Sequence, residues 1–113
     1  MLIFKILTDE EWRSFQAHGQ FTGASVDLAD GYIHFSSADQ VEETARKHFA
    51  HLSDLILVAV DPAQLGAALR YEPSRGGALF PHLYTSLTLA HVAWSKVLPL
   101  RTDGTHDFAG LLA

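Results

Sequence analysis

The stretch Leu55-Ile56-Leu57-Val58-Ala59-Val60 is a continuous apolar run in a chain of 113 residues. Its length and its β-branched residues are typical of a strand, and the absence of alternation predicts that both faces of this strand are buried. Asp61 and Pro62 end the run, and proline suits the first position of a helical turn, which we expect at residues 62–65. The run therefore predicts a buried strand at residues 55–60.

The flanking sequence carries helix signals before and after further strand signals. Thr8 and Glu11 have the spacing of a capping box and Gly19 stands where a C-cap glycine belongs, so residues 9–18 are predicted to form a helix. Ser37 and Gln40 repeat the capping-box spacing and open a second helix that runs to about residue 50. Strands or extended segments are predicted at residues 2–7, 32–36, 69–72, 80–84 and 89–100, with an irregular connection at residues 20–30.

The length and composition indicate one globular domain that spans residues 1–113, since 48% of the residues are hydrophobic and 19% are charged. Strands outnumber helices and most connections are short, so the fold class is α+β. We expect split, strongly bent, mixed β-sheets with two main helices packed on them. The main hydrophobic cluster is predicted to contain Trp12, Phe15, Phe49, Leu57 and Val58.

Composition excludes several classes of function. The chain has no cysteine, which excludes a disulfide scaffold, a thiolate nucleophile and a cysteine-ligated zinc site. The net charge of −5 argues against a globally basic nucleic-acid binder. No apolar run reaches the length of a membrane span, so we expect a soluble, cytoplasmic protein without membrane partners. The histidines lack metal-ligand spacing, and phosphate-binding glycine loops and a serine-hydrolase elbow are absent, so no metal site is predicted.

The segment from Gly31 to Ser36 presents a row of polar side chains. Strand alternation places Ile33 and Phe35 on one face, which we expect to be buried, and Tyr32, His34 and Ser36 on the other. Hydroxyl and imidazole groups in one row can hydrogen-bond a ribose or a phosphate. The alternative is the ordinary polar side of a solvent-facing strand.

A second row follows near residues 80–84. In an extended chain Phe80, His82 and Tyr84 share a face, and aromatic rings beside a histidine can stack on a planar base. The alternative is an edge stiffened by Pro81, whose histidine satisfies a backbone carbonyl.

Three charged residues lie near these rows in the sequence pattern. Glu72 ends a strand just before the Gly-Gly loop, a common position for a catalytic carboxylate. It can hold a ribose hydroxyl or stabilise an oxocarbenium-like centre, or it can form an ordinary surface pair with an arginine such as Arg75. Lys5 lies within an apolar strand, where a cation is costly unless it is paired or faces a cleft.

The segments together resemble a small bacterial family known only as a domain of unknown function, number nine hundred and fifty-two. The resemblance covers nearly the whole chain in the same order. It is carried by Ile3-Phe4-Lys5-Ile6 with Trp12, Gly31-Tyr32-Ile33-His34-Phe35-Ser36 with Gln40, Leu57-Val58-Ala59-Val60-Asp61, Tyr71-Glu72 and Phe80-Pro81-His82-Leu83-Tyr84.

That family in turn resembles, remotely, the ADP-ribosyltransferase fold and its tRNA 2′-phosphotransferase branch. The stretch from Ile3 through Gly19 to His34 is similar in order and spacing to the part of that fold that builds the nicotinamide dinucleotide cleft. The resemblance implies that Lys5 and His34 line a cleft, and that Tyr71 or Tyr84 stacks on a ring of the ligand. It also implies NAD as a co-substrate and, by remote analogy, RNA as a substrate.

Two hypotheses of different classes follow. In the first, an enzyme cleaves or transfers at a ribose: His34 and Ser36 contact ribose or phosphate, and Lys5 and Arg75 contact the pyrophosphate. Glu72 stabilises the cationic sugar and His82 is the acid/base, because imidazole titrates near neutral pH. In the second, the protein is a non-catalytic nucleotide-binding or protein-interaction module on the same fold.

Overall fold

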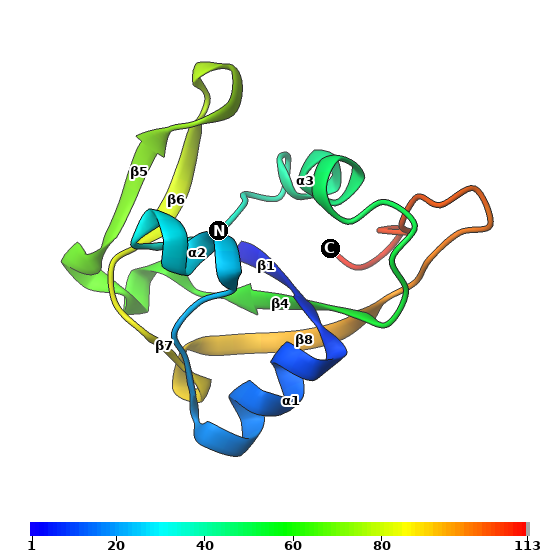
Figure 1. Cartoon of the computed structure of the whole chain (residues 1–113). Coiled ribbons are helices and arrows are strands. Elements are labelled where there is room, and N and C mark those ends of the chain that lie inside the picture. The colour runs from blue at the N-terminus through cyan, green and yellow to red at the C-terminus, as the bar shows by residue number, and fades with distance from the viewer. Residues whose placement is uncertain (113) are drawn as a thin grey trace.

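Figure 1 shows the chain as it folds in a computed structural model, which describes residues 1–112 except for the side chain of Arg75. Residues 1–112 contain eight strands and three α-helices, joined by short turns. The strands are β1 (Ile3–Thr8), β2 (Gln20–Phe21), β3 (Ile33–His34), β4 (Leu55–Val60), β5 (Leu69–Pro73), β6 (Leu79–Leu83), β7 (Leu87–Thr88) and β8 (Val92–Leu98). The helices are α1 (Asp9–His18), α2 (Ser25–Asp30) and α3 (Val41–His48), with 3-10 turns at Pro62–Gln64, Gly66–Ala68, Arg75–Gly77 and Leu89–His91.

The strands form three small sheets, in the orders β1-β4-β8, β3-β6-β5 and β2-β7. The α+β class is confirmed. The expected mixed sheets are wrong, because each of these strand pairs is antiparallel. Parallel neighbours need a crossover that returns the chain in the same direction, whereas each strand here meets its partner from the opposite direction. No helix among residues 1–112 is long and apolar enough to cross a membrane.

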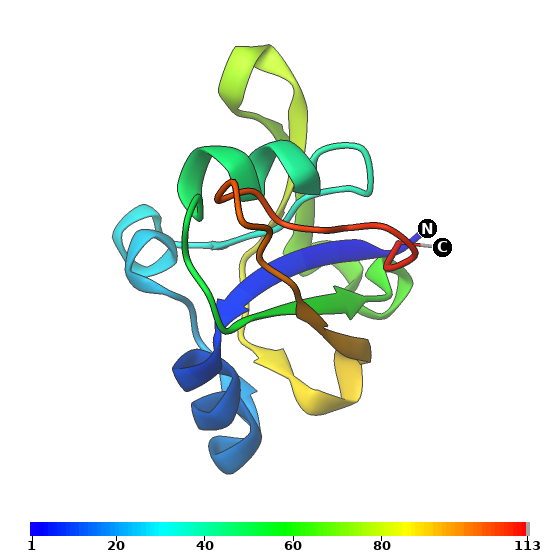
Figure 2. The ribbon, with the colours of Figure 1, turned by 90° about the vertical axis from the view of Figure 1, so that its right-hand side faces the viewer.

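The strand predicted at residues 55–60 is β4, the central strand of its sheet, and it is buried on both faces as expected. Val58 and Val60 belong to one apolar cluster, which includes Phe15 of α1. Leu57 and its alternate neighbours belong to a second cluster, which includes Val41 of α3. Figure 2 shows why: α1 lies on one side of the sheet, and α3 with the C-terminal segment lies on the other.

The sheet therefore divides the core, and the prediction of one main cluster is wrong. Phe15 and Val58 are buried in the first cluster and Leu57 in the second. Trp12 and Phe49 are only partly buried, each packed against the edge of one cluster.

Helix α1 has the bounds that its capping signals predicted. The Thr8 side chain accepts from the Glu11 N–H at 3.1 Å, and the Thr8 N–H donates to the Glu11 carboxylate at 2.9 Å. Gly19 ends the helix with φ +75°, a left-handed conformation that glycine adopts without strain. Helix α3 is shorter than predicted and begins at Val41, although the Ser37 N–H donates to the Gln40 side chain as the second capping signal implied.

The segment at residues 20–30 is not the irregular connection that we expected, since it contains β2 and α2. This is also why the molecule has three helices where two were predicted. Helix α2 has six residues and buries only Asp27, while Val26 and Leu28 are 57% and 64% exposed. This helix buries a charged residue and exposes apolar ones, which is the reverse of an amphipathic helix. The sequence therefore has no apolar stripe from which the helix could be predicted.

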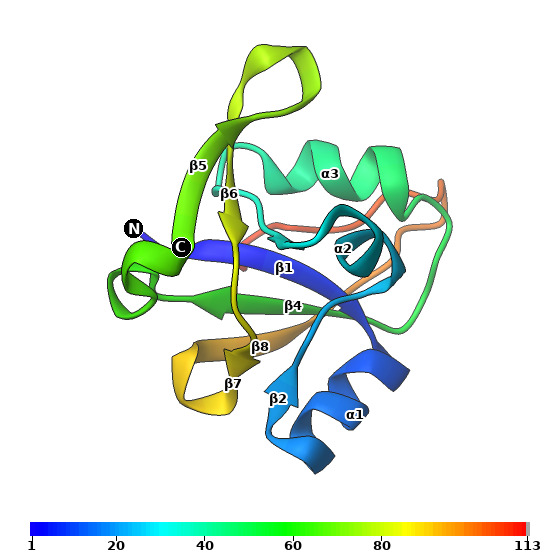
Figure 3. The ribbon, with the colours of Figure 1, turned by 60° about the vertical axis from the view of Figure 1, so that its left-hand side comes forward.

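Strands β5 and β6 form a hairpin that projects beside α2 and α3 (Figure 3). β6 also pairs with β3, and their register sets His34 directly opposite His82. Arg70 of β5 lies opposite His82 on the other side. This register brings the two polar rows of the sequence together on one sheet.

Candidate functional site

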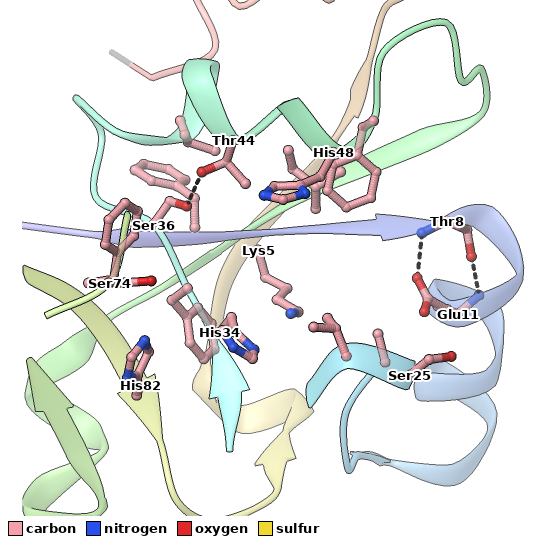
Figure 4. A pocket seen from close by; sticks show the side chains of 18 residues that line it. Lys5, Thr8, Glu11, Ser25, His34, Ser36, Thr44, His48, Ser74 and His82 are labelled. Carbon is pink, nitrogen blue, oxygen red and sulfur yellow. Dashed lines mark hydrogen bonds between the residues drawn. The ribbon is translucent and has the colours of Figure 1, made fainter. Parts of the chain in front are cut away.

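A cavity of about 580 Å³ lies among β1, α2, β3, α3 and β6. This volume is within the range of pockets that bind small molecules. Figure 4 shows the Lys5 side chain extending from β1 toward His34. Ser25 and His82 lie on the same side of β1 as His34, and Thr44 and His48 lie on the other side. Its lining residues are Phe4, Lys5, Ile6, Thr8, Glu11, Ala24, Ser25, Val26, His34, Phe35, Ser36, Val41, Thr44, His48, Phe49, Ser74, Phe80 and His82.

An ionic cluster centred on Asp27 lies behind one wall of this cavity, which its partners Lys5, Ala24 and His34 line. The Lys5 Nζ lies 3.0 Å from Oδ1 and 2.9 Å from Oδ2 of Asp27, and both residues are buried. The carboxylate also accepts from His34 Nδ1 at 2.6 Å, from the His34 N–H at 3.0 Å and from the Ala24 N–H at 2.8 Å. The other ring nitrogen of His34 lies 2.9 Å from the Asp30 carboxylate. Carboxylates only accept, so each ring nitrogen of His34 faces an acceptor.

The burial of this cluster acts against its charges. Burial by itself would raise the pKa of Asp27, but the hydrogen bond from His34 and the charge of Lys5 outweigh it and hold that pKa at about 2, against an ordinary value of 3.8. Burial lowers the pKa of Lys5 from its ordinary value of 10.5, and Asp27 opposes that change. Asp27 is therefore a carboxylate at every pH at which the cluster is intact.

Acid should weaken the fold through Asp27. Its folded pKa of about 2 lies below the ordinary value of 3.8, so its contribution is complete above about pH 4 and is lost as the pH falls toward 2. The difference corresponds to about 2 kcal/mol of unfolding free energy. Urea unfolding at neutral pH and near pH 2 should show this loss in the wild type and not in Asp27→Asn. Glu42→Gln, an exposed control, should keep the wild-type acid dependence, and equal slopes for Asp27→Asn and the wild type would contradict the prediction.

A second group of polar side chains backs His82. Its Nδ1 lies 2.8 Å from Oε1 of Glu72, and the Tyr84 hydroxyl donates to the same oxygen at 2.7 Å. Hydrogen bonds from Tyr84 and His82 lower the pKa of Glu72, and the same contact raises the pKa of Tyr84. Glu72 is therefore ionised, and the Nδ1 of His82 carries a proton that it donates to Glu72.

The remaining ring nitrogen of His82 is the unusual atom of the site. The residue is only 2% exposed, and its Nε2 is buried without a hydrogen-bond partner. His82 lines the cavity and Glu72 does not. A histidine beside a cavity, with one nitrogen fixed by a carboxylate and the other without a partner, is arranged for acid/base chemistry.

The ring of Tyr32 packs against the rings of His34, His82 and Tyr84. Its ring centroid lies 4.6 Å from that of His34, 4.2 Å from that of His82 and 5.2 Å from that of Tyr84. Burial, and after it the nearby charges of Asp30 and Glu72, raise the pKa of the Tyr32 hydroxyl. The stack fixes the planes of both histidine rings.

The structure places four of the eight predicted site residues at one cavity. Lys5, His34, Ser36 and His82 line the cavity. Ile33 and Phe35 are buried as predicted, and the Ser36 hydroxyl lies 2.9 Å from that of Thr44.

The other predicted residues lie elsewhere. Glu72 and Tyr84 are behind His82 and outside the cavity lining, and Tyr84 is 42% exposed with Arg70 stacked on its ring at 4.9 Å. Tyr71 is 50% exposed, and alternation along β5 turns it to the opposite face from Glu72. The side chain of Arg75 lies outside the described part of the structure. Within residues 1–112 no group of three or more histidine and acidic side chains could hold a metal ion.

Asp27 is the functional residue that sequence reasoning missed. The available signal was Gly31, which ends α2 with φ +87° in the way that Gly19 ends α1. Val26 and Leu28, on either side of the buried aspartate, are exposed, so the apolar residues of this segment do not mark its buried face.

The fold is similar to solved structures of a protein from Caulobacter crescentus. The X-ray structure of its protein CC0527 has a TM-score of 0.96 and 46% sequence identity, and the match covers 99% of this chain and 98% of that one. The solution NMR structure of CC0527 has a TM-score of 0.89 with 46% identity, over 99% of this chain and 97% of that one. No curated protein matches the chain.

A family model matches most of the sequence. It spans residues 6–95 and is described as a protein of unknown function, DUF952. The match includes the histidines of both polar rows and Asp27, although it begins one residue after Lys5. It agrees with the family resemblance inferred from the sequence motifs. The chain therefore belongs to the DUF952 family.

Proposed function

We propose that the cavity binds a nucleotide of the NAD or ADP-ribose type, and that His82 acts as acid and base in a cleavage or transfer at its ribose. The observation that carries this proposal is the buried Nε2 of His82, which has no hydrogen-bond partner although His82 lines the cavity. An unsatisfied buried acceptor costs free energy, which a ligand hydroxyl can recover. The Glu72 carboxylate behind it keeps the ring in the tautomer that accepts.

The chemistry of the walls supports a ligand with two unlike parts. Aromatic residues such as Phe4, Phe49 and Phe80 offer apolar surface for a planar base. Lys5 and His34 supply donors for phosphate or ribose oxygens. A nucleotide combines these features in one molecule.

The proposed reaction assigns the proton to His82. The bond between the ribose C1′ and the leaving base breaks, and the base departs with the bonding electrons. The oxygen of an acceptor hydroxyl forms the new bond to C1′, and its proton passes to the Nε2 of His82. Glu72 positions the ring rather than touching the sugar, because it lies outside the cavity lining. This revises the role that the sequence suggested for Glu72.

Binding should stabilise the fold. NAD or ADP-ribose at a hundred times its dissociation constant should add about 2.7 kcal/mol to the free energy of unfolding. Thermal denaturation with NAD, ADP-ribose and adenosine 2′-phosphate tests this, and a 2′-phosphorylated RNA oligonucleotide tests the RNA substrate suggested by remote resemblance. The shift should disappear in Lys5→Met and shrink in His82→Phe, while exposed Tyr71→Phe serves as the matched control. No shift with any of these ligands would contradict the proposal.

One observation favours a second candidate, a non-catalytic nucleotide-binding or protein-interaction module. The carboxylate that the transferase resemblance places against the sugar does not line the cavity. Release of nicotinamide from NAD that is lost in His82→Gln supports the enzyme, and binding without turnover supports the module. As parts of the same hypothesis, we propose that the fold is remotely similar to the ADP-ribosyltransferase fold and that the protein is cytoplasmic.

A further inference from the structure

The cavity as it stands presents a difficulty for an anionic ligand. Lys5 is the only lysine or arginine among the described side chains that line it. Its ammonium is already held by both oxygens of Asp27. Glu11 also lines the cavity, and Asp30 and Glu72 lie behind the histidines. In a chain with a net charge of −5, a phosphate or carboxylate entering this cavity meets no uncommitted lysine among the described side chains.

The Asp27 carboxylate itself lies in a well-formed anion site. Three of its donors belong to the body of the protein: the Lys5 ammonium on β1, and the ring and backbone N–H of His34 on β3. Only the Ala24 N–H comes from the N-terminal end of α2. The Lys5 ammonium, the His34 ring nitrogen and the His34 N–H converge on one buried point, and these groups are suited to any carboxylate or phosphate oxygen.

Helix α2 has little else to hold it there. Asp27 is its only buried residue, and its apolar side chains Val26 and Leu28 are exposed. Glycines with positive φ flank the helix, Gly23 at +131° and Gly31 at +87°. A Cβ on Gly23 would lie 2.7 Å from the Cβ of Asp27, so glycine is needed for this close approach. Withdrawal of the helix from β1 would therefore expose no buried apolar side chain of α2.

We propose that Asp27 is an internal competitor in the anion subsite of the cavity, and that the anionic group of a ligand binds Lys5 and His34 when α2 withdraws the Asp27 carboxylate. The ligand class is a small molecule that carries a phosphate or a carboxylate. The inference rests on the proposed function only for the identity of the whole ligand, of which the anionic group is one part. Its test needs only inorganic phosphate and formate, so it can fail or succeed independently of nucleotide binding.

The test compares two aspartates on one helix. Asp27→Ala empties the subsite, whereas Asp30→Ala removes the same charge three residues away and leaves Asp27 in place. Phosphate and formate are titrated into the wild type and both variants, and the signals of Lys5 and His34 are followed by NMR. We expect Asp27→Ala to bind at least one of the anions roughly tenfold or more tightly than the wild type. Tighter binding of formate alone marks a carboxylate subsite, and of phosphate a phosphate subsite.

Two results would overturn the proposal. Asp27→Ala could bind the anions no better than the wild type, which would make Asp27 a purely positioning residue for Lys5 and His34. Asp30→Ala could gain as much affinity as Asp27→Ala, which would reduce the effect to general charge. If Asp27→Ala is unfolded in anion-poor buffer, refolding on addition of formate or phosphate supports the proposal. Failure to refold, with no gain of affinity in Asp27→Asn, counts against it.

Discussion

Replacing Phe15 by alanine should lower the free energy of unfolding by about 3–5 kcal/mol, the cost of a large cavity in a packed core. Phe15 is 1% exposed and belongs to the cluster on the α1 side of the sheet. Its ring packs edge-on against Trp12 at 5.6 Å and lies 5.9 Å from that of Phe21. These two neighbouring rings leave little room for the site to collapse around alanine.

Trp12→Ala is the matched comparison, because Trp12 lies one helical turn earlier and is larger. It is only partly buried at the edge of the cluster, so water can fill part of the space that it leaves. Urea unfolding at neutral pH should rank Phe15→Ala as the more destabilising change. A loss below about 1 kcal/mol for Phe15→Ala, or a larger loss for Trp12→Ala, would show that the helix faces the core differently.

The elements that the sequence predicted correctly are those whose signals are local. Helix α1 has a capping box at Thr8 and a glycine at its end, and its observed bounds are the predicted ones. β4 was predicted from an uninterrupted apolar run, and it is the strand that the sheet buries on both faces. In both cases the residues that decide the structure lie within the element or next to it.

Helix α2 could not be predicted in the same way, because long-range contacts stabilise it. Its buried residue is an aspartate whose partners are Lys5, 22 residues earlier, and His34, seven residues later. Nothing within residues 20–30 indicates that such partners exist. The position of Lys5 in an apolar strand indicated that this lysine needs a partner or a cleft. The sequence did not indicate that the partner is Asp27.

In the candidate site too, local features could be predicted from the sequence and long-range contacts could not. Alternation within 32–36 predicted which side chains share a face, and His34 and Ser36 do line one cavity. That His34 lies opposite His82 depends on the register between β3 and β6, which are far apart in the sequence. The hydrogen bond between Glu72 and His82 depends on that register and on the β5–β6 pairing together. Sequence could therefore nominate these residues but could not assign Glu72 its place behind the ring.

The Lys5–Asp27 pair should be the most strongly coupled pair of charges in the described structure. Lys5→Met leaves the Asp27 carboxylate buried without its lysine, and Asp27→Asn leaves the Lys5 ammonium buried without a carboxylate. Removing one member of a buried pair costs about 3–5 kcal/mol, because the remaining charge is uncompensated. Methionine keeps the length of the lysine side chain, and asparagine keeps an oxygen for one of the two N–H groups, those of Ala24 and His34, that bind the two oxygens of Asp27.

The double variant decides whether this cost comes from the pair itself. Lys5→Met with Asp27→Asn removes both charges, so it should be less destabilised than the sum of the two single variants by about 1–3 kcal/mol. The exposed pair Lys47 and Glu43, 3.3 Å apart on α3 with half of each side chain accessible, is the control. The same cycle there should give a coupling of about 0.3–0.5 kcal/mol, because water and salt screen it. Urea unfolding of both sets measures the difference. Equal coupling in the two cycles would mean that the ionic cluster beside the cavity is as well solvated as a surface pair, and that neither Asp27 nor Lys5 holds α2 in place.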